Sequence, residues 1–226
     1  MTLSIIIPAL NEAACIEATL ASLAPLRGRG HEVIVVDGGS NDGTARVASP
    51  LADRVITAPR GRASQMNAGA AEARGDVLLF LHADSRLPDS ADGLVAQALA
   101  SSGRVWGRFD VAIEGTHPML PVIARFMNAR SRLTGIATGD QALFVQRDAF
   151  MRLGGFPPLA LMEDVALSAR LKRQSRPACL RANTTTSGRR WESSGVFRTV
   201  FLMWRLRLSF FLGASPERLA RIYEGA

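Results

Sequence analysis

The chain has 226 residues, of which 47% are hydrophobic and 21% charged. This balance is that of a globular protein with a sizeable core, and it excludes a disordered or fibrous chain. The formal net charge is +7, the sequence pI is about 11.0, and Lys172 is the only lysine, so arginine carries nearly all of the positive charge. An arginine fork binds phosphate through two hydrogen bonds, which raises a nucleic acid or a smaller phosphate ligand as partner. A compositional preference for arginine explains the exposed residues equally well.

Three further features limit the class of protein. The two cysteines, Cys15 and Cys179, lie far apart without clustered histidines, which excludes a disulfide framework and a structural zinc site. The opening segment is too short and lacks the basic region of a signal peptide, so a cytoplasmic location is expected. The longest apolar stretch, residues 196–212, is interrupted by three arginines and therefore fails the pattern of a transmembrane helix.

The first 84 residues alternate short branched apolar runs with helical patterns, which predicts a parallel sheet with crossover helices. The expected strands are residues 4–7, 32–36, 54–58 and 76–81. The expected helices are one that Asn11 caps, then 43–49, then 62–74 closed by Gly75 in a left-handed conformation. Right-handed crossovers place the loops after these strands at one sheet edge, where open α/β sheets bind ligands.

The second half has longer gaps between its motifs. Its expected helices are 89–101, 117–133, 148–153 and 162–172, and its expected strands are 105–114, 141–145 and 178–185. An apolar and basic stretch over 195–212 follows, and Ser215 and Pro216 begin a last helix. Because no repeat or low-complexity linker interrupts the chain, the sequence predicts a single α/β domain over 1–226, with a mostly parallel central sheet flanked by helices.

Acidic side chains follow two of the predicted strands. Asp37 directly ends the second strand and precedes glycines and a helix start, where it can bind a base or ribose while backbone amides approach a phosphate. Asp42, a few residues later, is better explained as a helix cap. Asp84 emerges after the fourth strand, where one carboxylate and a diphosphate suit Mg²⁺ or Mn²⁺. No GxGxxG motif follows the first strand, which disfavours a dinucleotide fold.

Six strings of residues together resemble a known family. They are IIIPALNE (5–12), VVDGGSNDGT (35–44), LLFLHADS (78–85), LGGF (153–156), MEDVALSARLKR (162–173) and GRRW (188–191). In this order they are similar to the family 2 glycosyltransferases, which have the nucleotide-diphosphosugar transferase (GT-A-like) fold. The combination of HAD, GDQALFV (139–145), LMED and RRWE resembles the subgroup known as radical-SAM/selenodomain-associated transferases.

The resemblance implies roles for individual residues. Asp164 matches the catalytic base of inverting members, with Glu163 beside it as a candidate for binding an acceptor hydroxyl, and Asp84 matches the last acid of the metal-binding Asp-x-Asp pattern for Mg²⁺ or Mn²⁺. The residues implied in nucleotide-sugar binding are Pro8, Ala9, Glu12, Asp37, Gly39, Gln65, Asn67, His82, Ala83, Arg189, Arg190 and Trp191. Arg62, at the start of the third crossover helix on the ligand edge, is expected either to reach the donor phosphates or to be a solvated arginine. On this view residues 1–85 form a nucleotide-binding half, 86–190 an acceptor-side half, and 191–226 a C-terminal helical segment.

The chemistry of glycosyl transfer explains these residue types. The acceptor attacks the anomeric carbon while a nucleoside diphosphate leaves, so a base is needed on one face and cationic groups on the other. A helix N-terminus favours the charged form of Asp164. The pattern departs from the family at His82, which replaces the first acid of Asp-x-Asp and leaves the metal site one carboxylate short.

Three hypotheses of different classes follow. The first is a metal-dependent, inverting glycosyltransferase that uses a UDP-sugar and an unknown acceptor, either a small molecule or a lipid-linked one. The second, motivated by His82, is a nucleotide-sugar-binding protein without transfer activity. A nucleic-acid-binding protein is disfavoured, because no reader module is recognisable and aromatic residues rarely alternate with basic ones.

The stretch 195–212 leaves two interpretations open. Phe197, Phe201, Trp204, Leu208 and Phe211 share one helical face with arginines around it. Such a stripe more often packs on the core, and this is the expectation here. The alternative is an interfacial helix that brings the protein to the inner face of the membrane. The sequence does not predict the oligomeric state.

Overall fold

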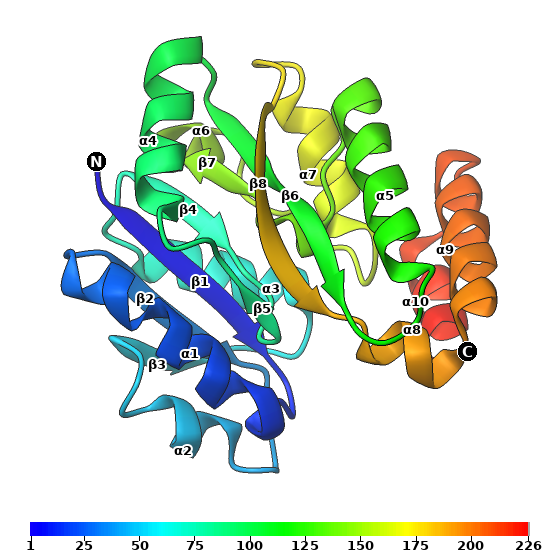
Figure 1. Cartoon of the computed structure of the whole chain (residues 1–226), viewed down its shortest axis with the longest axis horizontal. Helices are drawn as coiled ribbons and strands as arrows, with labels where there is room; N and C mark the ends of the chain where they lie inside the picture. Colours follow the sequence, from blue (N-terminus) through cyan, green and yellow to red (C-terminus); the bar gives the residue numbers. More distant parts are fainter. Residues whose placement is uncertain (226) are drawn as a thin grey trace.

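The computed structural model describes residues 1–225, and its centre is one eight-stranded sheet (Figure 1). The strand order is β3-β2-β1-β4-β7-β6-β8-β5. The strands are β1 Leu3–Ala9, β2 Glu32–Asp37, β3 Arg54–Thr57, β4 Val77–Phe80, β5 Ser85–Arg86, β6 Trp106–Glu114, β7 Phe144–Gln146 and β8 Ala178–Ser187. The first four strands are parallel, as predicted. The second half is mixed, because β7 runs antiparallel to both β4 and β6, while β6 and β8 are parallel.

Helices cover both faces of this sheet. They are α1 Ala13–Gly28, α2 Thr44–Ala48, α3 Arg62–Glu72, α4 Ala91–Ser102, α5 Leu120–Thr134, α6 Arg147–Arg152, α7 Glu163–Leu171, α8 Arg189–Ser194, α9 Val196–Phe211 and α10 Pro216–Glu224, with a 3₁₀ turn η1 at Gly139–Gln141. Along β1, Ile5 and Ile7 pack with α1 and α4, whereas Ile6 packs with α3, α6 and α7. Successive side chains of β1 thus point to opposite faces of the sheet, as expected for a strand that lies between two layers of helices.

The helices and strands expected from the sequence are present, with ends shifted by a few residues, but the N-cap of α1 differs. Asn11 lies before the helix with a left-handed φ of +55°, and its side-chain oxygen accepts a hydrogen bond from Asn41 N at 3.0 Å. The first helical N–H, that of Ala13, instead donates to the Asp42 carboxylate at 2.9 Å. A side chain from the next loop therefore caps α1, because Asn11 is used to turn the chain.

Gly75 also differs from its predicted role. Its φ is not in the left-handed region, and α3 ends at Ala73 in an extended conformation. A Cβ at Gly75 would lie 2.7 Å from the backbone nitrogen of Ser4. Glycine is therefore required by the close approach of β1 and not by the end of the helix.

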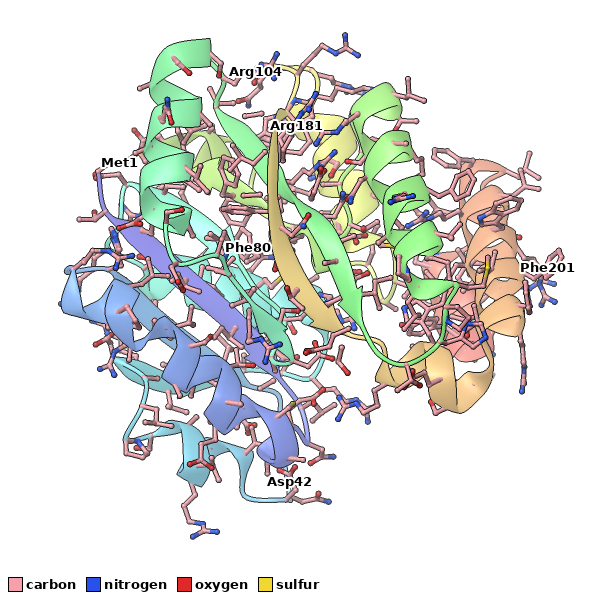
Figure 2. The ribbon with its side chains drawn as sticks, in the orientation of Figure 1. Met1, Asp42, Phe80, Arg104, Arg181 and Phe201 are labelled. Carbon is pink, nitrogen blue, oxygen red and sulfur yellow. The ribbon has the colours of Figure 1, made fainter. Side chains whose placement is uncertain are left out.

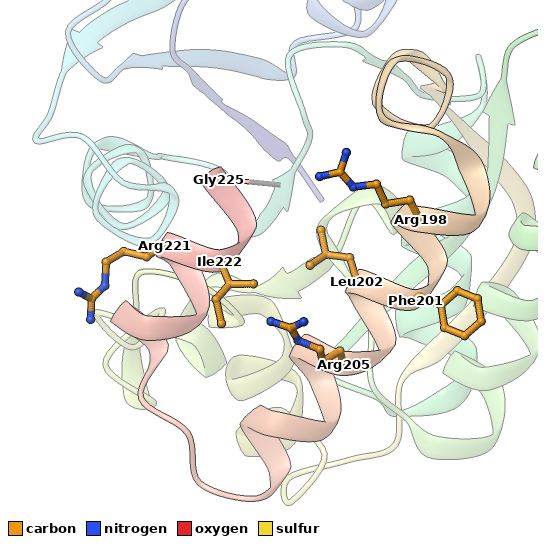
Figure 3. Close-up of a pocket in the computed structure, with 7 residues that line it drawn as sticks. All are labelled: Arg198, Phe201, Leu202, Arg205, Arg221, Ile222 and Gly225. Carbon is orange, nitrogen blue, oxygen red and sulfur yellow. The ribbon is translucent and has the colours of Figure 1, made fainter.

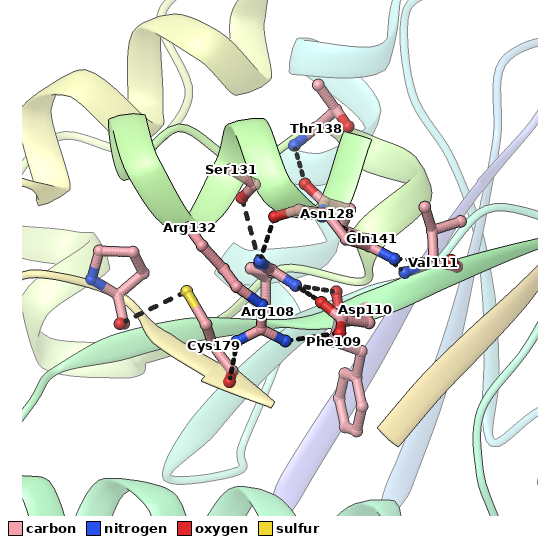
Figure 4. A network of polar contacts seen from close by, with 11 residues as sticks. Arg108, Phe109, Asp110, Val111, Asn128, Ser131, Arg132, Thr138, Gln141 and Cys179 are labelled. Atoms are coloured by element: carbon pink, nitrogen blue, oxygen red, sulfur yellow. Dashed lines mark hydrogen bonds and ion pairs between the residues drawn. The ribbon is translucent and has the colours of Figure 1, made fainter. Parts of the chain in front are cut away.

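A buried arginine joins β6 to α5 (Figure 4). Arg108 is 0% exposed, pairs with Asp110, and donates to the Ser131 hydroxyl and to the Asn128 carbonyl at 3.1 Å each. The Asn128 side chain in turn accepts a hydrogen bond from Gln141 in η1 at 3.1 Å. Since a buried guanidinium without partners is costly, this network fixes η1 against α5 and β6.

The C-terminal helices pack on α5 and on the start of α7. Val196 joins the α5 side chains Leu120 and Ile123, while Leu206 packs with Leu161 and Met162. The expectation that the apolar stripe of 195–212 packs on the core is wrong. Its five members, Phe197, Phe201, Trp204, Leu208 and Phe211, are 61–71% exposed. The reason is that α9 buries the opposite face, and Figure 2 shows Phe201 pointing away from the body of the protein.

Among the described residues, no helix combines the length and the hydropathy needed to cross a bilayer.

Candidate active site

A cleft of about 540 Å³ lies at the carboxyl ends of β1 and β4. Its walls come from the loops that follow these strands, the first turns of α3 and α7, η1, and α8 to α10. Most of the sequence-predicted site residues line it: Pro8, Ala9, Glu12, Arg62, Gln65, His82, Ala83, Asp84, Glu163, Asp164, Arg189, Arg190 and Trp191. The fold thus brings together residues from both halves of the chain at the edge where open α/β sheets bind ligands.

Three predicted residues, Asp37, Gly39 and Asn67, are not among those that line the cleft. The Asp37 carboxylate accepts hydrogen bonds from the backbone N–H groups of Gly39 at 3.1 Å and Ser40 at 3.0 Å, so it shapes the loop after β2. The Asn67 amide forms two 2.9 Å hydrogen bonds with the backbone of Phe156. In this structure Asn67 therefore ties α3 to the loop before α7.

Gln65 lines the cleft but is only 3% exposed. Its side-chain nitrogen donates to the carbonyl oxygens of Ala9 and Val36, both at 2.8 Å. These carbonyls end β1 and β2. Gln65 thus holds the two strand ends at a fixed separation beneath the cleft.

The acid pair stands at the N-terminus of α7, directly after a strained residue. Met162 has a left-handed φ of +67°, which is uncommon for a non-glycine residue and occurs preferentially at functional sites. Asp164 accepts a 2.8 Å hydrogen bond from Gly139 N in η1, which orients its carboxylate. Glu163 is 5% exposed, and burial together with the neighbouring charge of Asp164 raises the pKa of its carboxyl to about 7. The pair therefore contains one oriented carboxylate and one acid that is half-protonated near neutral pH.

A second group of polar side chains lies near Asp84, after the end of β4. Arg189 donates to the Glu12 carboxylate at 3.1 Å and lies 3.8 Å from the Asp84 carboxylate. His82 lies 3.3 Å from Asp140, a residue of η1. Burial raises the pKa of Asp140, but the His82 hydrogen bond and the charges of Arg62 and Arg207 more than offset this and lower it.

These residues suit a divalent ion that arrives with its ligand. Within residues 1–225, no three His, Cys, Asp or Glu side chains lie close enough together to bind a metal ion. Asp84, whose side chain is 25% exposed, therefore offers one carboxylate without such a group around it among the described residues. Mg²⁺ and Mn²⁺ accept such a site when waters and substrate phosphates complete their coordination.

The arginines of the cleft fall into two sets. Arg190 is fixed by the C-terminal helix, since its guanidinium stacks on the Tyr223 ring at 3.6 Å and donates to the Tyr223 carbonyl. Arg62 lies open to the cleft, and although desolvation lowers its pKa, the charges of nearby acids, Glu163 first, raise it overall. The cleft thus contains one arginine that the C-terminal helix fixes and one that lies open to it.

Sequence reasoning missed Asp140 and Arg207, which line the cleft, and Arg130 of α5, which does not line it but interacts electrostatically with Asp164 and Asp140. Desolvation lowers the pKa of Arg207 and lowers that of Arg130 to about 10, and side-chain nitrogens of both arginines are buried without a hydrogen-bond partner among the described residues. Asp140 stands inside the GDQ string noted above, so that signal was present. Arg207 could have been found as the one arginine of 195–212 that falls on the buried side of the helix.

The open α/β sheet with a polar cleft at its carboxyl edge defines a nucleotide-binding class of protein. The family model for glycosyl transferase family 2 matches residues 4–154, and the chain belongs to this family. A similar relative is the probable glycosyltransferase YdaM of Bacillus subtilis (strain 168), 29% identical over 197 residues, which cover 74% of this chain and 46% of YdaM. The chain thus spans less than half the length of this relative.

Two solved structures share the fold, which is the GT-A fold. The mannosyltransferase PcManGT from Pyrobaculum calidifontis, in complex with GDP-Man and Mn²⁺, has a TM-score of 0.65 and 21% identity, and the match covers 98% of this chain and 68% of that one. S. aureus TarS 1–349 in complex with UDP has a TM-score of 0.67 and 18% identity, covering 83% of this chain and 60% of that one. The fold predicted from the sequence is confirmed, with a mixed sheet in place of a mostly parallel one.

Proposed function

We propose that this chain is a metal-dependent, inverting glycosyltransferase that moves a sugar from a UDP-sugar donor to an acceptor. The observation that supports this best is the composition of the cleft. Asp164 and Asp84 both line it, together with arginines from α3 and α8. A single displacement at an anomeric carbon needs a base opposite the cationic groups that receive the leaving diphosphate.

In the proposed reaction Asp164 accepts the proton of an acceptor hydroxyl. The acceptor oxygen then bonds to the anomeric carbon, while the bond from that carbon to the diphosphate oxygen breaks and its electron pair leaves with the nucleoside diphosphate. The hydrogen bond from Gly139 N holds the Asp164 carboxylate in one orientation for this step. Arg189 and Arg190 are placed to neutralise the departing diphosphate.

The proposal assigns Asp84 as the protein ligand of Mg²⁺ or Mn²⁺. When bound, the ion stabilises negative charge on the leaving diphosphate. Arg189 lies 3.8 Å from the Asp84 carboxylate, so the same carboxylate would hold the ion beside a guanidinium that can bind phosphate. The Mn²⁺ complex of the structurally similar mannosyltransferase supports a divalent ion, and the UDP complex of TarS supports the uridine donor.

The proposal also covers the organisation of the protein. Residues 1–85 supply the nucleotide side of the cleft, 86–190 the acceptor side, and 191–226 the segment that closes over the donor. Within the family, the HAD, GDQ, LMED and RRWE strings support assignment to the radical-SAM/selenodomain-associated subgroup. The proposed location is cytoplasmic, at the inner face of the membrane.

The test is donor hydrolysis or transfer, measured with a UDP-sugar panel in the presence of Mn²⁺. Activity is expected to stop with EDTA and to fall by at least about 100-fold in Asp164→Asn, since general base catalysis contributes about that much or more. Asp84→Ala is expected to lose metal-dependent activity, while Asp89→Ala, an exposed acid remote from the cleft lining, serves as control. Full activity in Asp84→Ala or Asp164→Asn would remove that residue from the mechanism.

A second candidate is a nucleotide-sugar-binding protein without transfer activity. It is favoured by His82, which stands where an acid would complete the metal site, and by the single carboxylate that remains. Calorimetry with UDP and Mn²⁺ gives binding under both proposals. Product analysis across small-molecule and lipid-linked acceptors separates them, because only the transferase forms a glycosidic bond.

A further inference from the structure

The outer faces of α5 and α9 form one exposed apolar surface. All exposed large hydrophobic side chains of the described residues except Met1 and Met151 lie on these two helices or directly after α9. Phe201 is 71% exposed and Trp204 68%, and Phe126 on α5 is 72% exposed. The two helices pack against each other through Ile123 and Val196, and they stand side by side at one end of the molecule (Figure 1). An apolar patch of this extent marks an interaction surface.

The charge around this surface has one sign. Neither α5 nor α9 contains an acidic residue. Arg198 and Arg205, seven residues apart on α9, lie along one edge of the apolar stripe and are exposed. Neither guanidinium has a hydrogen-bond or ion-pair partner within residues 1–225. Arginines that the protein leaves unpaired beside a wide apolar face are complementary to an anionic surface with an apolar interior.

A groove between α9 and α10 continues this edge (Figure 3). It has a volume of about 480 Å³ and is lined by Arg198, Arg205 and Arg221 together with Phe201, Leu202 and Ile222. Arg198 and Arg205 extend from α9 beside Leu202, whereas the Arg221 guanidinium points away from them (Figure 3). Two guanidiniums beside apolar side chains match the chemistry of a phosphate attached to an acyl chain. The groove opens on the outside of α9, whereas the active-site cleft lies along Thr199, Met203 and Arg207 on the inner side of the same helix.

We propose that α5 and α9 form a docking surface for an anionic lipid bilayer and that the α9–α10 groove binds a lipid phosphate headgroup. The apolar stripe inserts at the level of the headgroups and upper acyl chains, with α9 parallel to the membrane plane. Trp204 suits this depth, because indole combines an apolar ring with a polar N–H. The inference deepens the inner-membrane location given under the proposed function, but it does not require donor binding or transfer.

The experiment is co-sedimentation of the full chain with sucrose-loaded vesicles. One set contains equal parts phosphatidylglycerol and phosphatidylcholine, and the other contains phosphatidylcholine alone. We expect binding to the anionic vesicles only, weakened by salt through screening of the arginines. The fluorescence of Trp204 is expected to shift to shorter wavelength on binding, and Trp204→Phe is expected to remove most of that shift while the protein still sediments.

Matched variants test whether vesicle binding depends on this surface or reflects nonspecific adsorption of the protein. Arg198→Gln with Arg205→Gln is expected to weaken partitioning about 25-fold, at about fivefold for each arginine. The control pair, Arg46→Gln with Arg74→Gln, removes two exposed arginines elsewhere and should bind like the wild type. Phe201→Ser with Leu208→Ser is expected to abolish binding, whereas Met151→Ser, at an exposed apolar side chain elsewhere, is not.

Several results would overturn the inference. They are equal binding to both vesicle types, binding that the control variants weaken as much as the surface variants do, or no binding to either vesicle type. A dimer in light scattering that Phe201→Ser with Leu208→Ser converts to a monomer would assign the surface to a second copy of the chain. Calorimetry with UDP and Mn²⁺ on the same preparations tells the two proposals apart, because loss of nucleotide binding with intact vesicle binding would count against the proposed function alone.

Discussion

Glu163 makes the stability of this protein depend on pH in a predictable direction. Burial and the charge of Asp164 raise the pKa of its carboxyl from 4.5 to about 7 in the folded state. Below pH 4.5 both folded and unfolded forms are protonated and no penalty exists. As the pH rises toward 7, the unfolded chain releases this proton while the folded protein retains it, so stability falls. One pKa unit corresponds to about 1.4 kcal/mol, which places the full loss on the order of 3 kcal/mol.

The perturbation that tests this reasoning is Glu163→Gln, which keeps the shape of the side chain and removes its titration. The measurement is urea unfolding of the wild type and the variant from pH 4.5 to about pH 8, with the free energy of unfolding extrapolated to water. The free energy of unfolding of the variant, relative to that of the wild type, is expected to rise by about 3 kcal/mol across this range. Glu17→Gln, at an exposed glutamate on α1, serves as control. The difference in free energy of unfolding between this control and the wild type should not change with pH. A pH-independent difference between wild type and Glu163→Gln would refute the raised pKa.

Three further changes test how the fold supports the site. Asn67→Ala is expected to lower stability by about 1–3 kcal/mol, because the N–H and carbonyl of Phe156 lose their partner, and UDP affinity in calorimetry should be unchanged. Gly107→Ala places a Cβ 2.3 Å from a backbone oxygen of β8, so thermal unfolding is expected to show a loss of at least about 1–3 kcal/mol. Burial and then the Glu12 hydrogen bond raise the pKa of the Cys15 thiol to about 12, so its alkylation by iodoacetamide near neutral pH is expected to be slow and to accelerate in Glu12→Gln.

Local sequence determined most of the fold. The branched apolar runs at 4–7, 32–36 and 76–81 fall within or around the parallel strands β1, β2 and β4, because alternation and crossover helices leave few other arrangements. The strand directions in the mixed second half of the sheet could not be predicted from local sequence. The direction of β7 depends on which strand it meets, and β4 and β6 contact it from opposite sides. Strand order of this kind is a tertiary property without a short sequence signal.

The same limit applies to the site. Asp164 and Asp84 could be predicted as site residues because Asp164 lies in a string that resembles the family and Asp84 follows a recognisable strand, whereas the partners that orient them come from elsewhere. Gly139 N reaches Asp164 only because the buried Arg108 network fixes η1. Asn67 was predicted to bind the nucleotide-sugar, but it lies on α3 where Phe156 meets the helix. Such pairings join residues far apart in the chain, so no spacing rule could predict them.

The net charge of +7 is distributed over two regions with different electrostatics. In the cleft, Arg62 and Arg189 stand beside Glu163, Glu12 and Asp84, so the cleft carries little excess charge before a diphosphate enters. On the outer side of α9, Arg198 and Arg205 lack such partners among the described residues.

Because Thr199, Met203 and Arg207 of α9 face the cleft while Phe201 and Trp204 face outward, one helix separates the two regions. In the proposed docking, a bilayer would hold one side of this helix while its other side lines the cleft, so the two sites would be coupled through α9. A change in its packing against the membrane would then move Arg207 relative to Asp164. The two proposals together predict an acceptor presented at the membrane surface, because the proposed membrane-binding helix also lines the cleft.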